Sequence, residues 1–100
     1  MYGPELTGHW TGLVAPKPFE HLQPDRRYMV SSEFTDFDGD LHPVGETWRF
    51  KSYGFNRFED GLSLFVSLDD QREWHIRLSW TPEHQGAIID NLKNYVRLAP

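Results

Sequence analysis

Cysteine is absent from this chain of 100 residues, and the absence excludes several chemistries. Disulfides, thiolate catalysis and zinc sites with cysteine ligands cannot form. A chain of this length buries enough surface to fold without such crosslinks. The lack of cysteine fits a reducing compartment, and the first residues lack the basic and then apolar pattern of a secretory signal, so we expect a cytoplasmic protein.

Long hydrophobic runs and an excess of positive charge are missing as well. No apolar stretch approaches the ~20 residues of a membrane span, so we expect no membrane association. Fifteen acidic residues against ten basic ones leave a net charge of −5. A field of this sign repels phosphate groups and disfavours nucleic acid as a partner, whereas it favours a basic protein. The oligomeric state has no signature in this pattern.

Hydrophobic and polar residues alternate in several short segments from Arg27 onward, and this alternation is typical of half-buried β-strands. The predicted strands span residues 28–34, 47–51, 62–68 and 74–80, with a short last strand at 95–99. Turn signals separate them, among them the Asp-Gly pair at residues 38–39.

One helix is predicted before the last strand. Thr81 is a natural N-cap, and Pro82 suits the first helical position. Ile88, Leu92 and Tyr95 recur at helical spacing and form one apolar stripe. The change of period from two to about 3.6 residues therefore marks the end of the run of strands.

The first 21 residues have no regular pattern, because prolines and glycines interrupt it. We expect residues 1–21 to be an irregular segment that wraps a single β-barrel-like domain of residues 22–100, although residues 9–14 could form a short edge strand. The order of elements predicts a mainly β fold, a small SH3-like antiparallel barrel with one short helix before the last strand, since closure removes exposed edges. The alternative is an α+β fold in which one helix packs on an antiparallel sheet.

Two groups of residues resemble a known family. The first group is Tyr28-x-Val30, Phe34-x-Asp36-x-Asp38-Gly39 and His42-Pro43-x-Gly45-Glu46-x-Trp48-x-Phe50. The second group is Glu59-Asp60-Gly61-Leu62-Ser63-Leu64-Phe65 and Ile76-Arg77-Leu78-x-Trp80. Over residues 22–98 they are similar to domain-of-unknown-function family 3601, which consists of small uncharacterised bacterial domains. The resemblance implies a fold and brings no activity, and Asp25 stands where we expect that family to have glycine.

The loop at residues 36–46 carries the densest set of polar groups, which are Asp36, Asp38, Asp40, His42 and Glu46. Its Asp-x-Asp-x-Asp spacing is similar to that of a calcium loop. The positions at which an EF-hand requires glycine and glutamate hold Leu41 and Thr47 instead. We therefore predict no metal site and interpret this acidic loop as a solvated turn.

His42 precedes Pro43 and is expected to bond a neighbouring carboxylate or carbonyl group. Paired with Asp36 or Glu46, it could instead act as a general base. No nucleophile motif and no phosphate-binding glycine loop accompany it, so we predict no catalytic residue and no cofactor. The alternative hypothesis is a small metal-dependent or ligand-binding enzyme that uses this loop.

Four phenylalanines are predicted in loops or on the outward side of a strand, and they are Phe37, Phe55, Phe58 and Phe65. Aromatic side chains beside carboxylates are common on protein-binding surfaces and can form a groove for an extended peptide. They could equally cover the barrel mouth or pack under the N-terminal segment. We predict a non-catalytic protein-interaction module, such as an acidic inhibitor or immunity-type partner, that binds through the acidic loop and these aromatic residues.

Overall fold

The computed structural model describes residues 1–100 with the exception of the Leu13 side chain. Its strands are β1 (Tyr2–Leu6), β2 (Arg27–Val30), β3 (Phe34–Thr35), β4 (Leu41–His42), β5 (Thr47–Asn56), β6 (Gly61–Ser67), β7 (Arg72–Ser79) and β8 (Val96–Leu98). Its helices are the α-helix α1 (Gly86–Asp90) and the 3-10 helices η1 (Thr11–Leu13) and η2 (Leu92–Asn94). None of the helices in this described chain has the length and hydrophobicity that a membrane crossing requires.

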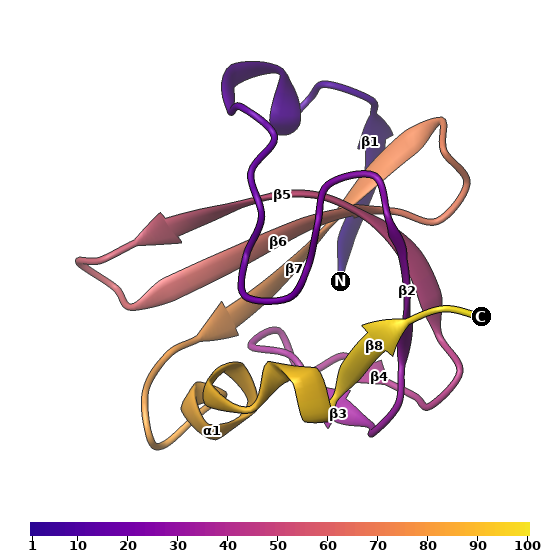
Figure 1. The fold of residues 1–100 in the computed structure, drawn as a ribbon. Helices are drawn as coiled ribbons and strands as arrows, with labels where there is room; N and C mark the ends of the chain where they lie inside the picture. Colours follow the sequence, from indigo (N-terminus) through magenta and orange to yellow (C-terminus); the bar gives the residue numbers. More distant parts are fainter.

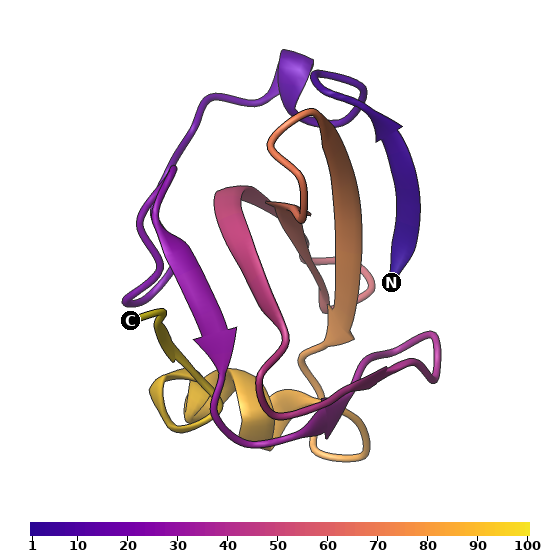
Figure 2. The same cartoon turned by 90° about the vertical axis from the view of Figure 1, so that its right-hand side faces the viewer.

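Six strands form one antiparallel sheet in the order β1-β7-β6-β5-β2-β8, and β3 pairs with β4 separately. Figure 1 shows α1 beside β8 at one end of the molecule, and Figure 2 shows the curvature of the sheet between β1 and β2. The predicted mainly β class, with one short α-helix before the last strand, is confirmed.

The predicted closure into a barrel is wrong for the strands that the structure describes. β1 bonds only to β7 and β8 bonds only to β2, so both are edge strands. β8 has three residues, and β1 is interrupted by a bulge and contains Pro4, which has no amide hydrogen. These two strands therefore offer too few backbone donors and acceptors to complete a closing ladder.

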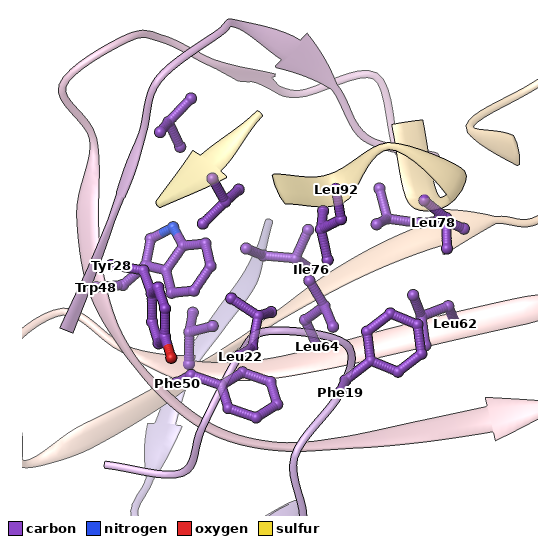
Figure 3. Close-up of a cluster of buried hydrophobic side chains, with 14 of the residues drawn as sticks. Phe19, Leu22, Tyr28, Trp48, Phe50, Leu62, Leu64, Ile76, Leu78 and Leu92 are labelled. Atoms are coloured by element: carbon purple, nitrogen blue, oxygen red, sulfur yellow. The ribbon is translucent and has the colours of Figure 1, made fainter. Parts of the chain in front are cut away.

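The hydrophobic core lies on one face of the sheet, where β2, β5, β6 and β7 meet η2 and the segment before β2 (Figure 3). The alternation in β6 and β7 fills it as predicted, because Leu62, Leu64, Ile76 and Leu78 are all buried. Trp48 is the largest fully buried side chain. Each such side chain contributes about 1.5–3 kcal/mol of transfer free energy, which makes this cluster the main source of stability.

The N-terminal segment is not irregular throughout, because residues 2–6 form β1 along the edge of β7. The pairing contains a bulge between Tyr2 and Glu5, which hides any alternation from the sequence. Gly3 lies in this bulge with a φ of +119°, and a Cβ atom there would come within 2.9 Å of the Glu73 carbonyl oxygen. Only glycine accepts both the positive φ and the close approach of the Glu73 carbonyl oxygen. The glycine that interrupts the strand pattern in the sequence is thus the residue that allows β1 to form.

The possible strand at residues 9–14 is replaced by η1. The buried carboxylate of Glu73 holds this segment, since Oε1 accepts hydrogen bonds from the Trp10 and Thr11 amides and Oε2 accepts them from the Gly8 amide and the Thr11 hydroxyl group. Glu73 and these donors, together termed the Glu73 clasp, are separated by 62 to 65 positions in the chain. A local pattern cannot reveal a contact of that range.

The helix begins later than the sequence predicts, because residues 81–85 form turns ahead of α1. The Gln85 side chain explains the difference. Its Oε1 accepts a hydrogen bond from the Ser79 amide at 2.9 Å, and its backbone amide donates to the Ser79 carbonyl oxygen at 2.9 Å. This ties the turn back onto β7, and the buried apolar residue of α1 is then Ile89, one position after the predicted Ile88.

The predicted strand at residues 28–34 is divided into β2 and β3. After Val30 the amides of Ser31 and Ser32 both donate to the carbonyl oxygen of Tyr95, at 2.7 and 3.3 Å. This break takes β3 and the acidic loop out of the main sheet, so that β3 pairs with β4 instead.

Candidate functional site

The acidic loop is organised around His42, whose imidazole ring lies between two carboxylates. Nε2 of His42 is 2.8 Å from Oδ2 of Asp36, and Nδ1 is 2.6 Å from Oε2 of Glu46. The pairing of β3 with β4 brings these residues together, and the Phe34 ring stacks on the imidazole with 4.7 Å between centroids. Nε1 of Trp48 donates to the same Glu46 oxygen at 3.2 Å. The expected bond of His42 to a neighbouring carboxylate is therefore present twice.

Burial and charge together set the protonation of this group. His42 and Asp36 are 1% and 2% exposed. Burial alone would lower the pKa of His42, but the hydrogen bonds and charges of Glu46 and Asp36 raise it above its usual value. Burial would raise the pKa of Asp36, but the bonds from His42, the Asp40 amide and the chain's amino group lower it. The imidazolium and the carboxylate thus stabilise each other in their charged forms.

Asp36 also fixes the shape of the loop. Its Oδ1 accepts hydrogen bonds from the amides of Asp38 and Asp40 at 2.9 and 3.0 Å, as a turn-forming aspartate does. Its Oδ2 accepts a bond from the Met1 amino group at 3.1 Å in addition to the one from His42. The carboxylate is thus fully engaged within the fold, and across the described residues no group of three His, Asp or Glu side chains could hold a metal ion.

Arg77 of β7 holds the outer part of the loop. Its Nε donates to Oδ2 of Asp38 at 3.1 Å, its Nη2 donates to Oδ1, and its carbonyl oxygen accepts a bond from the Phe37 amide at 2.8 Å. The guanidinium lies 4.7 Å from the Tyr2 ring centroid and 5.9 Å from that of Phe37. The Phe37 ring touches His84 edge to face at 5.3 Å and is still 49% exposed.

A pocket of about 490 Å³ opens beside Phe37. Two segments that are distant in the sequence contribute to it, namely the acidic loop and the turn between β5 and β6, and the strands β6 and β7 complete it. This space is termed the Phe37 pocket, and the side chains that matter below are Phe37, Asn56, Glu59, Ser63, His75 and Arg77.

The other predicted aromatic residues differ in their surroundings. Phe58, in the β5–β6 turn, is 88% exposed, and Phe55 lies on β5 itself with its ring 5.8 Å from that of Trp80. Phe65 is on the outward side of β6 as predicted, but only 8% of it is exposed. Trp10 of the N-terminal segment stacks over Phe65 with 6.3 Å between centroids. Phe65 is therefore not a surface residue, and the alternative of packing under the N-terminal segment is correct for it.

His75 is a pocket residue that the sequence did not single out. Its ring lies among those of Tyr2, Trp10 and Phe65, with 5.1 to 6.2 Å between centroids. Burial and the positive charge of Arg77 lower the pKa of His75 to about 4. Its Nε2 is buried and has no hydrogen-bond partner among the described residues. The alternation of residues along β7 predicts only that His75 points outward from the sheet, and an ordinary solvent-exposed histidine would do the same.

Comparison with solved structures identifies a relative of this chain. The integron cassette protein VCH_CASS4, from the mobile metagenome of Vibrio cholerae, matches with a TM-score of 0.77 and 30% sequence identity, over 81% of this chain and 89% of that protein. The chain belongs to the family of this integron cassette protein. The expected likeness to small bacterial proteins is thereby confirmed, and the name of this integron cassette relative carries no activity. No family model and no curated protein matches the chain, so membership of family 3601 stays a prediction.

Proposed function

We propose that this relative of the integron cassette protein VCH_CASS4 is a non-catalytic interaction module whose partner is a basic protein. The observation that carries the proposal is the Phe37 pocket, because it joins the acidic loop to the β5–β6 turn. These are the segments in which Phe37 and Phe58 expose their rings. Phe55 pairs with the buried Leu62 and contacts Trp80, so its ring lies on the other face of the sheet from the pocket. An exposed ring that lines a pocket, with a second exposed ring in the adjoining turn, is characteristic of a protein-binding surface.

The charge around the pocket supports a basic partner. Glu59 and Asp60 of the turn are exposed and outnumber its one cation, Arg57. The cation of the pocket, Arg77, is already paired with Asp38. Asp40 of the loop is paired with the Met1 amino group and adds no free charge. The net charge of −5 adds a long-range attraction for a positively charged protein and raises its rate of association. An inhibitor or immunity-type protein would use a surface of this kind to cover a basic partner.

The position of His42 supports a role without catalysis. A general base must reach the proton of its substrate with a free nitrogen. Both nitrogens of His42 are bonded to carboxylates, and the ring is buried under Phe34. The carboxylates that a metal-dependent enzyme would need are bonded to the loop itself or to Arg77.

Partner capture from cells that carry the gene, read by mass spectrometry, tests the proposal. Phe37→Ala removes the exposed ring that lines the pocket, and Phe58→Ala removes the exposed ring of the turn that contributes Glu59 to the pocket. Leu98→Ala is the matched control, because it removes an exposed apolar side chain from β8 at the far edge of the sheet. Asp36 is left unchanged, since its loss would disturb the loop and not only the surface.

We expect one basic protein to be retained by the wild type and by Leu98→Ala and to be lost by the other two variants. Thermal unfolding of each variant confirms that it is folded. Equal recovery of the same proteins by all four, or the recovery of no basic protein by the wild type, contradicts the proposal.

A further inference from the structure

Residues 1–13, termed the N-terminal cover, lie over Phe65 and His75 on the outward face of the sheet. Trp10 stacks on Phe65, which is only 8% exposed. Trp10 and Tyr2 also lie against the His75 ring, with 5.4 and 6.2 Å between centroids. Two of the three aromatic rings around His75 therefore come from the beginning of the chain, and the third is Phe65.

The N-terminal cover is held largely by hydrogen bonds. No described side chain of β1 or η1 belongs to the buried core cluster, and the ladder between β1 and β7 is interrupted by the bulge. The Glu73 clasp and the bonds of the Met1 amino group to Asp36 and Asp40 also hold it. Segments with few buried apolar contacts open at a lower free energy than the core does. The cover can therefore lift while the strands beneath it stay paired.

The closed cover disfavours a charged His75. An imidazolium ring carries an N–H on each nitrogen, and a buried N–H requires an acceptor. Nε2 of His75 is buried and has no hydrogen-bond partner in the part of the chain that the structure describes. Burial and the positive charge of Arg77 lower the pKa of His75 to about 4. Once the cover lifts, water can solvate the ring, and the usual pKa of a histidine is about 6.5.

The other charged groups around His75 do not reverse this effect. The charged and titratable groups near it are Arg77 and Glu73 on its own strand, the Met1 amino group, Tyr2 and His9 on the cover, and Asp38 in the acidic loop. The Met1 amino group acts in the same direction as Arg77. Asp38 acts in the opposite direction, but it is paired with Arg77. The carboxylate of Glu73 is bonded within the clasp.

We propose that the N-terminal cover is released by acid, because protonation of His75 opens it and uncovers Phe65 beside the Phe37 pocket. Phe65 and the pocket residue Ser63 are both on the outward side of β6, so the open state extends the apolar surface next to the pocket. This inference goes beyond the proposed function and does not depend on a protein partner.

The size of the effect follows from proton binding. Between pH values of about 4 and 6.5, the open state binds one proton more than the closed state, so opening becomes more favourable as the pH falls. The equilibrium constant for opening should rise about 20-fold from pH 7 to pH 5. Glu73 adds little in this range, because a solvated glutamate takes up its proton only near a pH of about 4.3.

Amide hydrogen exchange of the whole chain, followed by NMR from pH 7 to pH 5, measures the opening. The amides of Gly8, Trp10 and Thr11 report on the cover, since they are bonded in the Glu73 clasp, and the amides of β6 report on the core. After correction for the intrinsic exchange rate at each pH, we expect the cover amides to be less protected than those of β6 and to lose protection by the factor given above.

Three variants assign the effect to one side chain. His75→Phe keeps a ring in the aromatic cluster and removes the protonated group, so the loss of protection in acid should vanish. His75→Gln should give the same result, and it serves where the phenylalanine ring disturbs the packing. His9→Phe is the matched control, because it removes a 53% exposed histidine of the same cover and should keep the response of the wild type.

A loss of protection in His75→Phe and His75→Gln that equals that of the wild type overturns the inference. Equal protection of the cover amides and the β6 amides at every pH also overturns it, since the cover then opens only when the whole domain unfolds. The same holds for a His75 ring that takes up its proton near its usual pKa while the cover amides stay protected.

Discussion

Replacement of Glu73 by glutamine should destabilise the protein far more than the small change of shape suggests. The carboxylate is 2% exposed and accepts hydrogen bonds from three amides and one hydroxyl group. Glutamine keeps only one oxygen, so it can satisfy the donors of one side. Its NH₂ group then faces either the Gly8 amide or the amides of Trp10 and Thr11, donor against donor.

The magnitude follows from the bonds that are lost. A hydrogen bond to a charged group contributes about 1.5–3 kcal/mol, and a buried donor left unpaired costs about 1–3 kcal/mol. Loss of the charge together with one unpaired amide gives an expected destabilisation of about 2–4 kcal/mol. For a domain of this size, that change lowers Tm by roughly 10–20 °C.

The pH dependence of the effect is a second consequence. Burial would raise the pKa of Glu73, but the hydrogen bonds from Trp10, Thr11 and Gly8 lower it below its usual value. A carboxyl group whose pKa is depressed by folding stabilises the protein above its unfolded pKa, and this contribution is lost as the pH falls through the folded pKa. The difference in the free energy of unfolding between the wild type and Glu73→Gln should therefore become smaller below a pH of about 4.

Urea and thermal unfolding at neutral and acidic pH measure both effects. Glu33→Gln is the matched control, because Glu33 is exposed. Amide hydrogen exchange locates the change, since the amides of Gly8, Trp10 and Thr11 should exchange faster in Glu73→Gln. If Glu73→Gln unfolds at the same midpoint as Glu33→Gln at pH 7, or if the difference between them is the same in acid, the reasoning about the Glu73 clasp is refuted.

Two further predictions concern the acidic loop and the β1 bulge. His42 stabilises the fold in its charged form. Its contribution to the free energy of unfolding should be fully present below the unfolded pKa of about 6.5 and should be lost as the pH rises through the raised folded pKa. In urea titrations at neutral and alkaline pH, His42→Ala should remove this decline and cost about 3–5 kcal/mol, whereas a similar profile in His42→Ala and in the exposed control His9→Ala would contradict it. Gly3→Ala should destabilise by about 1–3 kcal/mol, because of its positive φ and the close Glu73 carbonyl oxygen. Gly12→Ala, where a Cβ meets no atom within 4 Å, serves as control in the same thermal assay, and equal Tm values would count against the bulge.

The strands that could be predicted from the sequence are those that bury alternate residues on one face. Leu62 and Leu64 on β6, like Ile76 and Leu78 on β7, show the period of two directly. β1 could not be predicted, because all five of its residues are exposed and its stability comes from backbone bonds to β7. The helix α1 starts later than the sequence predicts for a similar reason, since the Gln85 side chain accepts a hydrogen bond from β7 and not from its own helix.

The candidate site was predictable to the extent that its contacts are local. Asp36, His42 and Glu46 lie within eleven consecutive positions, so their spacing was enough to expect a pairing. The burial of Phe65 depends on Trp10, and the Phe37 pocket depends on a loop, a turn and His75 that meet only in the folded sheet. The hydrophobic periodicity of a single strand does not reveal such contacts between distant segments, because the same periodicity is compatible with an outer face that is exposed to solvent.

The order of strands in the sheet also bears on how the chain folds. β5, β6 and β7 follow one another as hairpins, so their pairing closes only short loops. β1 is at the start of the chain, and five strands, β2 to β6, separate it in the sequence from its partner β7. Long loops cost more entropy to close, and the contacts that require them form late. We therefore expect the hairpins to form the folding nucleus, and we expect β1 and η1, which contribute no described side chain to the buried core cluster, to be the unit that can detach and return while the core persists.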